Sequence, residues 1–253
     1  MKLGIVGKGG VGKTTTSALV AATFAARGRR VVAIDTDSNP NLGVSLGLSI
    51  DEAEAVPVVP KSVATGPGAG MDGRELLSTY GRLTPAGVTL LSAMRVDQAG
   101  AGCTCSSHAS VRSMLRNVLD DESDVTIVDM EAGLEHLSRS GGTLAYADVL
   151  LMVMEPSRKS ILTAARTVPL AEDLGIPRCL GIGNKARMPE DGEFFAEACA
   201  SSGVELGGVI PLDAAIPAAD RAGTAVTGVE AGAAQEAVSR LVDRLEAIDL
   251  AGR

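Results

Sequence analysis

The feature that most constrains this fold is a glycine-rich turn between an apolar run and a helical pattern. Residues 2–6 are mostly apolar and predict a strand, and residues 13–27 have the small and apolar residues of a buried helix. The turn between them reads GKGGVGKT from Gly7 to Thr14 and matches the pattern G-x-x-x-x-G-K-[ST] at every position. A strand, a turn and a helix in this order predict one unit of a parallel α/β sheet.

The rest of the chain repeats this alternation of apolar runs and helical patterns. Further strands are predicted at 31–35, 88–92, 124–129, 148–154, 178–183 and 206–210. Further helices are predicted at 107–119, 160–174, 191–202, 214–222 and 231–248. Several strands are apolar throughout, which is typical of parallel sheets covered on both faces. We therefore expect a single α/β domain over residues 1–253, with a doubly wound, mostly parallel sheet and helices on both faces.

One stretch interrupts the alternation. Residues 52–73 contain three prolines and the run GPGAG, and such composition is typical of loops. We expect a flexible insertion there, because too little sequence precedes it to complete a separate domain. Residues 52–85 as a whole carry no recognisable motif.

Composition excludes several classes of protein. The 31 acidic side chains outnumber the 23 basic ones, for a net charge of −8, whereas affinity for nucleic acid comes mostly from clustered Lys and Arg. No apolar run reaches the roughly 18 residues of a membrane span, and the start of the chain does not resemble a signal peptide. The last predicted helix has a polar face of mixed charge, unlike a membrane-surface helix. We expect a cytoplasmic protein that binds neither nucleic acid nor membrane.

The glycine turn is predicted to bind the phosphates of a nucleotide, with ATP and Mg²⁺ as the expected ligands. Glycines let consecutive backbone N–H groups surround phosphate oxygens, and the dipole of the following helix adds positive charge. Lys13 is expected to neutralise the β- and γ-phosphates, and the Thr14 hydroxyl to bind Mg²⁺. The predicted phosphate-binding residues are Gly9, Gly10, Val11, Gly12, Lys13, Thr14 and Thr15.

Three aspartates follow two of the predicted strands. Asp35 ends the strand at 31–35 and Asp37 lies two residues further on, and Asp129 ends the strand at 124–129. Ligands of doubly wound sheets bind beyond the carboxyl ends of the strands. We therefore expect Asp35 and Asp129 to hold Mg²⁺ and Asp37 to orient an attacking water. Each aspartate alone would be equally consistent with a helix cap, but their occurrence beside the glycine turn favours the functional interpretation.

The run from Lys8 to Thr15, KGGVGKTT, resembles the signature of the deviant-Walker ATPases. This family includes Min-type division-site ATPases, plasmid-partition ATPases, arsenite-pump ATPases and nitrogenase iron protein. The resemblance implies a homodimer that sandwiches two ATP molecules, with Lys8 reaching the partner's nucleotide and Asp37 as the hydrolytic aspartate. Two later segments resemble the family's adenine contacts, and their residues are Asn184, Lys185, Pro211, Leu212 and Asp213.

A pair of cysteines, Cys103 and Cys105, follows a glycine-rich segment. Cysteines two residues apart form a mutual disulfide only with strain, but each pair can supply two of the four ligands of a tetrahedral metal site. A two-fold dimer would bring four thiolates around one ion. Thiolate ligands are compatible with Zn²⁺, Cu(I), Ni²⁺ or an iron–sulfur cluster, and two ordinary loop cysteines remain the alternative.

Two further runs of sequence resemble one subgroup of this family. The run GCTCSSHASVR at 102–112 and the run DMEAGLEHL at 129–137 resemble the CooC-type ATPases, which deliver nickel to carbon monoxide dehydrogenase. The resemblance implies an ATP-dependent metallochaperone that dimerises with ATP or metal, binds Ni²⁺ or Zn²⁺ at the cysteine pair and serves a client metalloenzyme. No cysteine follows Asp129 directly, which argues against a bridged iron–sulfur reductase.

Several residues and functions stay open at this stage. Cys179 and Cys199 are expected to be core residues, and His108 and His136 to have surface or capping roles rather than to bind metal. The alternative functions are a nucleotide-switch regulator of a protein partner and a partition- or division-type ATPase that acts on DNA or membranes.

Overall fold

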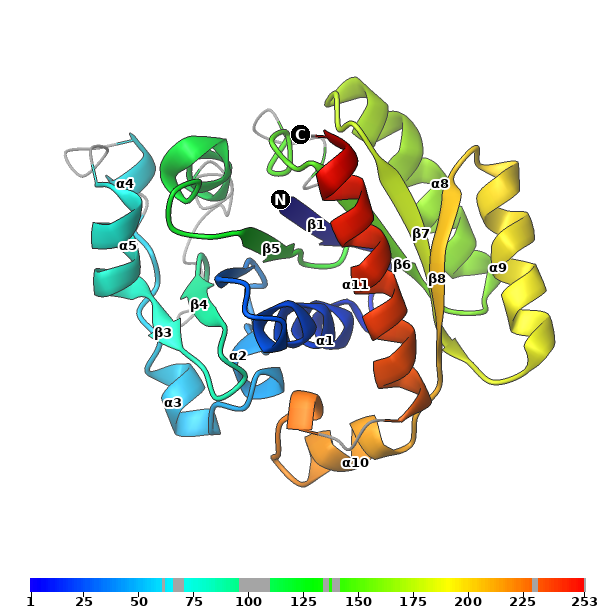
Figure 1. The fold of residues 1–253 in the computed structure, drawn as a ribbon, viewed down its shortest axis with the longest axis horizontal. Coiled ribbons are helices and arrows are strands. Elements are labelled where there is room, and N and C mark those ends of the chain that lie inside the picture. Colours follow the sequence, from blue (N-terminus) through cyan, green and yellow to red (C-terminus); the bar gives the residue numbers. More distant parts are fainter. Residues whose placement is uncertain are drawn as a thin grey trace.

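A computed structural model describes residues 1–60, 62–65, 71–95, 110–133, 137, 142–228 and 232–252. Within these residues the chain forms an eight-stranded sheet in the order β3-β4-β2-β5-β1-β6-β7-β8, seen in Figure 1. Neighbouring strands are parallel except β3 and β4. The strands are β1 (Lys2–Val6), β2 (Val31–Asp35), β3 (Arg82–Leu83), β4 (Thr89–Ser92), β5 (Val125–Asp129), β6 (Val149–Met154), β7 (Cys179–Ala186) and β8 (Glu205–Pro211).

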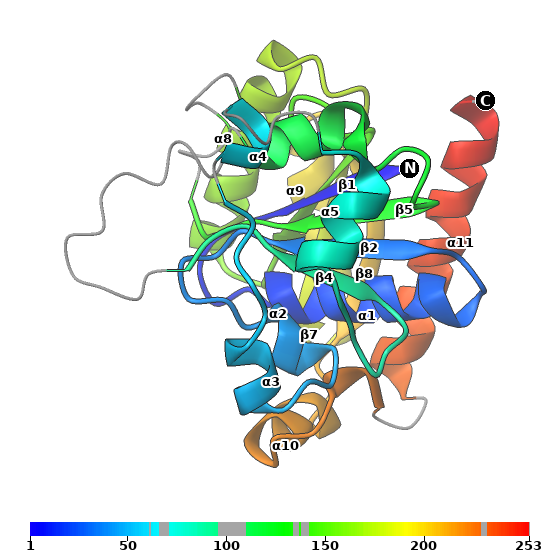
Figure 2. The same ribbon diagram turned by 90° about the vertical axis from the view of Figure 1, so that its left-hand side faces the viewer.

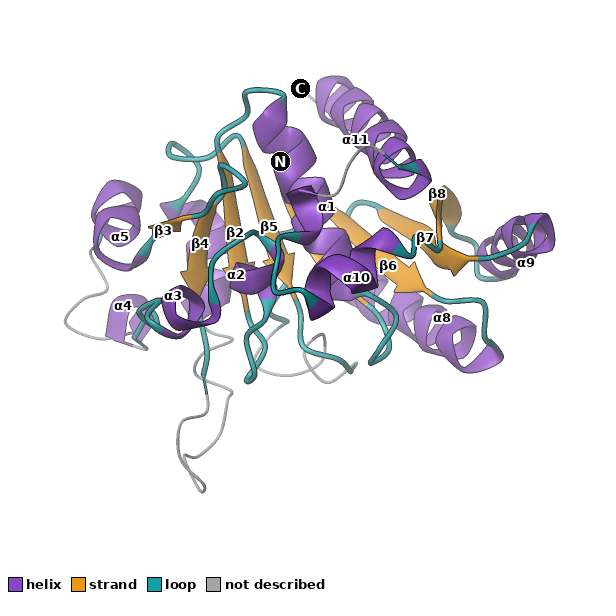
Figure 3. Cartoon of the chain, turned by 90° about the horizontal axis from the view of Figure 1, so that it is seen from below, coloured by secondary structure: helices purple, strands orange, loops and turns teal. Residues whose placement is uncertain are grey.

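Helices cover both faces of the sheet, as Figure 3 shows. On one face α1 (Lys13–Ala26), α2 (Leu42–Ser45) and α11 (Ala233–Gly252) enclose one apolar core. On the other face α5 (Gly73–Tyr80), α8 (Arg158–Asp173) and α9 (Pro189–Ser201) enclose a second core. Further helical segments within the described residues include α3 (Ile50–Glu54), α4 (Ser62–Thr65), α10 (Ala215–Arg221), a π-helical turn at Met114–Val118 and a 3₁₀ turn at Val226–Gly228. The predicted fold class is confirmed, and the predicted strands agree with the observed ones to within a few residues.

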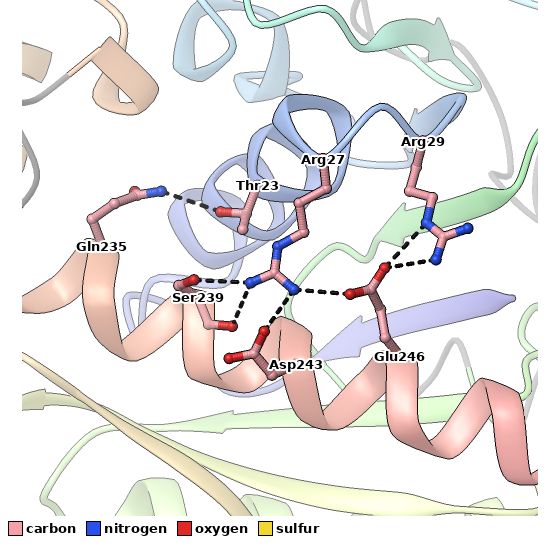
Figure 4. Close-up of polar contacts among 7 residues, drawn as sticks. All are labelled: Thr23, Arg27, Arg29, Gln235, Ser239, Asp243 and Glu246. Atoms are coloured by element: carbon pink, nitrogen blue, oxygen red, sulfur yellow. Dashed lines mark hydrogen bonds and ion pairs between the residues drawn. The ribbon is translucent and has the colours of Figure 1, made fainter.

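The C-terminal helix α11 is held against α1 by both apolar and polar contacts. Its apolar residues Val238, Leu241, Val242 and Leu245 are buried. Figure 4 shows the polar contacts: Arg27 Nη1 lies 2.7 Å from an Asp243 carboxylate oxygen and 2.9 Å from one of Glu246. Arg29 Nη2 lies 2.8 Å from the other Glu246 oxygen. The helix that begins at the glycine turn is thus fixed at its far end. Within the described residues, no helix is both long enough and apolar enough to cross a membrane.

Part of the stretch at 52–73 forms regular secondary structure. The prediction of a loop is wrong for these residues. It contains the end of α3, a bridge between Val58 and Ser92, and all of α4. A capping box, in which Ser49 and Glu52 bond each other's backbone, begins α3. Val56 and Val59 are buried, so they anchor the stretch to the domain. Figure 2 shows α3, α4 and α5 along the edge of the sheet formed by β3 and β4.

Candidate functional site

The glycine turn lies between β1 and α1, at the carboxyl end of a central strand. Gly10 and Gly12 have φ angles of 82° and 95°, a left-handed region that favours glycine. A Cβ atom on Gly12 would also collide with the side-chain amide of Asn184. Thr16 N donates to Gly12 O at 2.9 Å, so α1 begins directly after the turn. The free N–H groups of its first turn therefore point toward the glycine loop.

Asn184 and Lys185, at the end of β7, hold the outer side of this loop. Asn184 Nδ2 donates to Val11 O at 2.8 Å, and Lys185 Nζ donates to Gly10 O. Asn184 is buried, and Lys185 has a φ of 60°. The structure thus gives these two residues a contact that sequence reasoning missed, because the loop lies 173 residues earlier in the chain. Their predicted contact with adenine stays a prediction.

The segment from Pro211 to Asp213 lies beside Asn184 and Lys185. Leu212 N donates to Ala186 O at 2.7 Å, which joins the ends of β7 and β8. Asp213 Oδ1 accepts from Ala215 N, the first residue of α10, at 2.9 Å. Leu212 is exposed. The residues predicted to surround the base therefore come from neighbouring strand ends.

The side chain of Lys13 is surrounded by acidic residues. Its Nζ lies 3.4 Å from Lys8 O, and the side chain is largely buried. Burial lowers the pKa of Lys13, and the charges of Asp129, Asp37 and Glu131 oppose this effect in that order. The ammonium group is therefore positioned at the phosphate loop within the field of three carboxylates. The sequence analysis did not identify Glu131 as a residue of this site.

Asp35 and Asp129 lie opposite each other in the register of β2 and β5, and each is only 1% exposed. Asp129 Oδ1 accepts from Ser17 Oγ at 2.9 Å, and the Thr14 and Ser17 side chains both act to lower the pKa of Asp129. Burial, with the charge of Asp35 as the second cause, raises the pKa of Asp129 to about 7. Burial also raises the pKa of Asp35 to about 6, against the opposing hydrogen bond from Leu42 N.

Two buried carboxylates and the Thr14 hydroxyl form a set of oxygen donors, which is the type of ligand that Mg²⁺ prefers. Burial is the main cause of the raised pKa of both carboxyls, and the positive charge of a bound divalent cation would oppose it. The donor set therefore fits Mg²⁺. Ser17 joins this set because it lies three residues after Thr14, on the same face of α1, and that spacing could have identified it.

The loops that follow β2 and β5 contact each other. Thr36 Oγ1 donates to Asp129 O at 2.8 Å, and Ser38 Oγ donates to Glu131 Oε1 at 3.0 Å. Asp37 lies between Thr36 and Ser38 in the chain, and its Oδ1 accepts from Asn39 N at 2.9 Å. The structure therefore brings Asp37, Asp129 and Lys13 together at one edge of the sheet, as the sequence predicts.

The other predicted residues have different outcomes. Lys8, Gly9 and Thr15 lie in the loop and the first turn of α1, as the motif implies. Cys199 is buried, and Cys179 is half-buried and packs against the same core; burial raises the pKa of both thiols. The residues Cys103, Cys105, His108 and His136 lie outside the described residues. Within the described part of the chain, no three His, Cys, Asp or Glu side chains form a group that could hold a metal ion.

A glycine loop at the carboxyl edge of a parallel sheet, with a buried lysine and buried acids at neighbouring strand ends, defines a P-loop nucleotide-binding protein. The family model described as the CobQ/CobB/MinD/ParA nucleotide binding domain matches residues 5–226. The chain belongs to this family, and it is a P-loop ATPase.

Relatives and solved structures agree with this assignment. The chain is 38% identical over 237 residues to the carbon monoxide dehydrogenase accessory protein CooC of Rhodospirillum rubrum, covering 88% of each chain. It is 30% identical to the antiactivator FleN of Pseudomonas aeruginosa, covering 83% of this chain and 72% of FleN. Its fold is similar to MinD of Pyrococcus horikoshii complexed with Mg-ADP, with a TM-score of 0.71 at 21% identity over 98% and 96% of the two chains. A ParA family ATPase from Chlorobium tepidum has a TM-score of 0.74 at 18% identity, over 96% and 98%.

Proposed function

We propose that this ATPase is a dimerising metallochaperone that binds nickel through Cys103 and Cys105 and delivers it to a metalloenzyme such as carbon monoxide dehydrogenase. The observation that carries the proposal is the 38% identity to CooC over 88% of both chains, in a chain that has a C-x-C pair. Nickel is the cargo in this account, and zinc fits the same thiolate chemistry.

The site residues suggest how the chain would use ATP. The loop N–H groups bind the phosphates, and the Lys13 ammonium moves from the Lys8 carbonyl to the β- and γ-phosphate oxygens. Thr14, Asp35 and Asp129 would hold Mg²⁺, which supplies positive charge against the phosphates when it is bound. Asp37 orients the attacking water, and Lys8 reaches the nucleotide of the partner subunit.

Dimerisation links the nucleotide to the metal. A cysteine pair from each subunit gives the four thiolates that one soft ion requires. Because ATP favours the dimer and the metal also favours the dimer, each ligand raises the affinity for the other. Hydrolysis separates the subunits and lowers the affinity for the metal, which allows its transfer to the client.

The test is the assembly state and metal content of Asp37→Ala, which should bind ATP but not hydrolyse it. With saturating ATP and Mg²⁺, light scattering should show a dimer. Metal analysis of the same sample should show one nickel ion per two chains. Cys103→Ser/Cys105→Ser in the same background should lose the metal, whereas the matched control Cys179→Ala/Cys199→Ala should keep it. A monomeric Asp37→Ala protein under these conditions would contradict the sandwich dimer.

A second candidate, a nucleotide-switch regulator of a protein partner, has support from the 30% identity to the antiactivator FleN. A regulator would retain metal unchanged through the ATPase cycle. A partition- or division-type role has less support, because the apolar face of α11 is buried on the domain rather than free for a membrane surface. ATP-dependent binding to DNA or to lipid vesicles would favour that role.

A further inference from the structure

Helices α8 and α9 carry stripes of opposite charge on their solvent-facing sides. Exposed cations of α8 form the basic stripe, which consists of Arg158, Lys159 and Arg166. Exposed acids of α9 form the acidic stripe, which consists of Glu190, Glu193 and Glu197. In the part of the chain that the structure describes, no side chain of either stripe forms an ion pair. The two stripes therefore do not neutralise each other within one chain.

The basic stripe departs from two rules for an exposed helix. The first turn of α8 contains Arg158 and Lys159 and no acidic residue, although the partial positive charge at a helix N-terminus disfavours cations there. Leu162 lies on the same side of the helix, between these cations and Arg166, and is 51% exposed. An acidic surface that covered the stripe would offset both departures, because it would pair the cations and bury the leucine.

The two helices present their charges at matching heights. Strands β6 and β7 are parallel neighbours and lead into α8 and α9, so both helices begin at the same edge of the sheet; Figure 1 shows the helices next to each other. Lys159 is the second residue of α8 and Glu190 the second of α9, and Arg166 and Glu197 are each the ninth. A two-fold axis between the helices and parallel to them would place α8 of one copy against α9 of the other at unchanged height. Each of these cations would then face an acid, twice in the dimer.

We propose that the outer surface of α8 and α9 is a self-association surface, on which a second copy of this chain docks with its acidic stripe against the basic stripe. The inference goes beyond the proposed function and requires neither nucleotide nor metal, because the stripes lie on the helices that cover one face of the sheet. A polyanion such as nucleic acid or an anionic membrane fits less well, since the neighbouring acidic stripe repels it. The paired groups are solvent-exposed, so the dimer is weak and sensitive to salt.

Sedimentation velocity of the full chain tests the surface, without nucleotide and with a chelator that removes metal. In about 0.05 M salt the wild type should dimerise at a protein concentration of about 0.1 mM. In about 1 M salt it should be monomeric, because the screening length falls to about 3 Å. A wild type that stays monomeric in low salt, or a dimer that persists unchanged in high salt, would overturn the proposal.

Two double variants test the pairing of the stripes. Lys159→Glu/Arg166→Glu and Glu190→Lys/Glu197→Lys should each weaken self-association by about tenfold or more, because like charges then face each other at four places. An equimolar mixture of the two variants should form a dimer with a Kd within about threefold of the wild-type value, since every reversed stripe then meets an opposite one. Misfolding of either variant would not be repaired by mixing. A mixture that remains monomeric would contradict the proposed pairing.

Arg74→Glu/Arg240→Glu is the matched control for the basic-stripe variant. It reverses two cations whose side chains are 85% and 68% exposed, outside both stripes, and it changes the net charge by the same amount. This control should dimerise like the wild type. If it weakened self-association as much as Lys159→Glu/Arg166→Glu does, net charge rather than the stripes would govern the association, and the proposal would be wrong.

Discussion

Asp129→Asn should stabilise the nucleotide-free protein near pH 8 and remove much of the pH dependence of its stability. In the folded protein the pKa of Asp129 rises from 3.8 to about 7, chiefly because the side chain is buried. The folded state therefore holds this proton more tightly than the unfolded chain does. The resulting stabilisation is fully present below pH 3.8 and is lost as the pH rises through about 7.

The magnitude follows from the size of the change in pKa. At 1.36 kcal/mol for each pKa unit, a rise from 3.8 to about 7 corresponds to a loss of about 4 kcal/mol between pH 4 and pH 8. An asparagine does not ionise, and its amide oxygen can still accept the hydrogen bond from Ser17. We therefore expect the variant to be more stable than the wild type at pH 8 by about 2–4 kcal/mol and similar to it near pH 4.

Urea unfolding without nucleotide and Mg²⁺, at pH 4 and pH 8, measures this difference. Titrating groups far from Asp129 are common to both proteins and cancel at each pH, whereas Asp35, whose charge interacts with that of Asp129, loses this repulsion in the variant and further reduces its pH dependence. The same variant should lose most of the stabilisation that Mg²⁺ and ATP give the wild type. A variant that is less stable than the wild type at pH 8, or that keeps the full pH dependence of the wild type, would refute the assignment of a buried, ionisable site.

Three further changes test other parts of the account. Lys13→Ala should weaken ATP binding by about 100-fold or more, because two charge-assisted phosphate contacts are lost; calorimetry measures the Kd, and an unchanged value would exclude Lys13 from the site. Gly12→Ala should lose nucleotide binding and lower the free energy of unfolding in urea by about 2–3 kcal/mol, because the added Cβ would collide with Asn184 and the residue has a φ of 95°. Arg27→Met should destabilise the protein by about 1 kcal/mol through its lost contacts with α11, with most of the effect at neutral pH. The hydrogen bond from Arg29, and to a smaller extent that from Arg27, lowers the pKa of Glu246, so the part due to Arg27 is present above the ordinary pKa of Glu246 and is lost as the pH falls through its lowered value.

Local physical rules account for the parts of the fold that the sequence predicted. The glycine loop is recognisable because its φ angles and close approaches restrict the residues that fit. The central strands are recognisable because a parallel sheet covered on both faces requires uninterrupted apolar runs. Asp35 and Asp129 could be placed together because both end strands at the same edge of such a sheet.

The parts that were missed depend on contacts between distant residues or on short elements. Ser38 and Glu131 lie 93 residues apart, and neither residue type alone indicates the other. The helix α3 has a visible signal, the capping-box spacing of Ser49 and Glu52, but the prolines that follow directed the interpretation toward a loop. The strand β3 has two residues, which is too short for a periodic pattern.

The central claim is that nucleotide binding controls the affinity for a metal held by Cys103 and Cys105. The most direct measurement is a nickel titration of the full chain, with Mg²⁺ and ATP present or absent, on the wild type and on Cys103→Ser/Cys105→Ser. The account predicts tighter nickel binding by the wild type with ATP, at one ion per two chains, and no comparable binding by the double variant. Equal nickel affinity of the double variant and the wild type, or an affinity of the wild type that is unaffected by ATP, would contradict it.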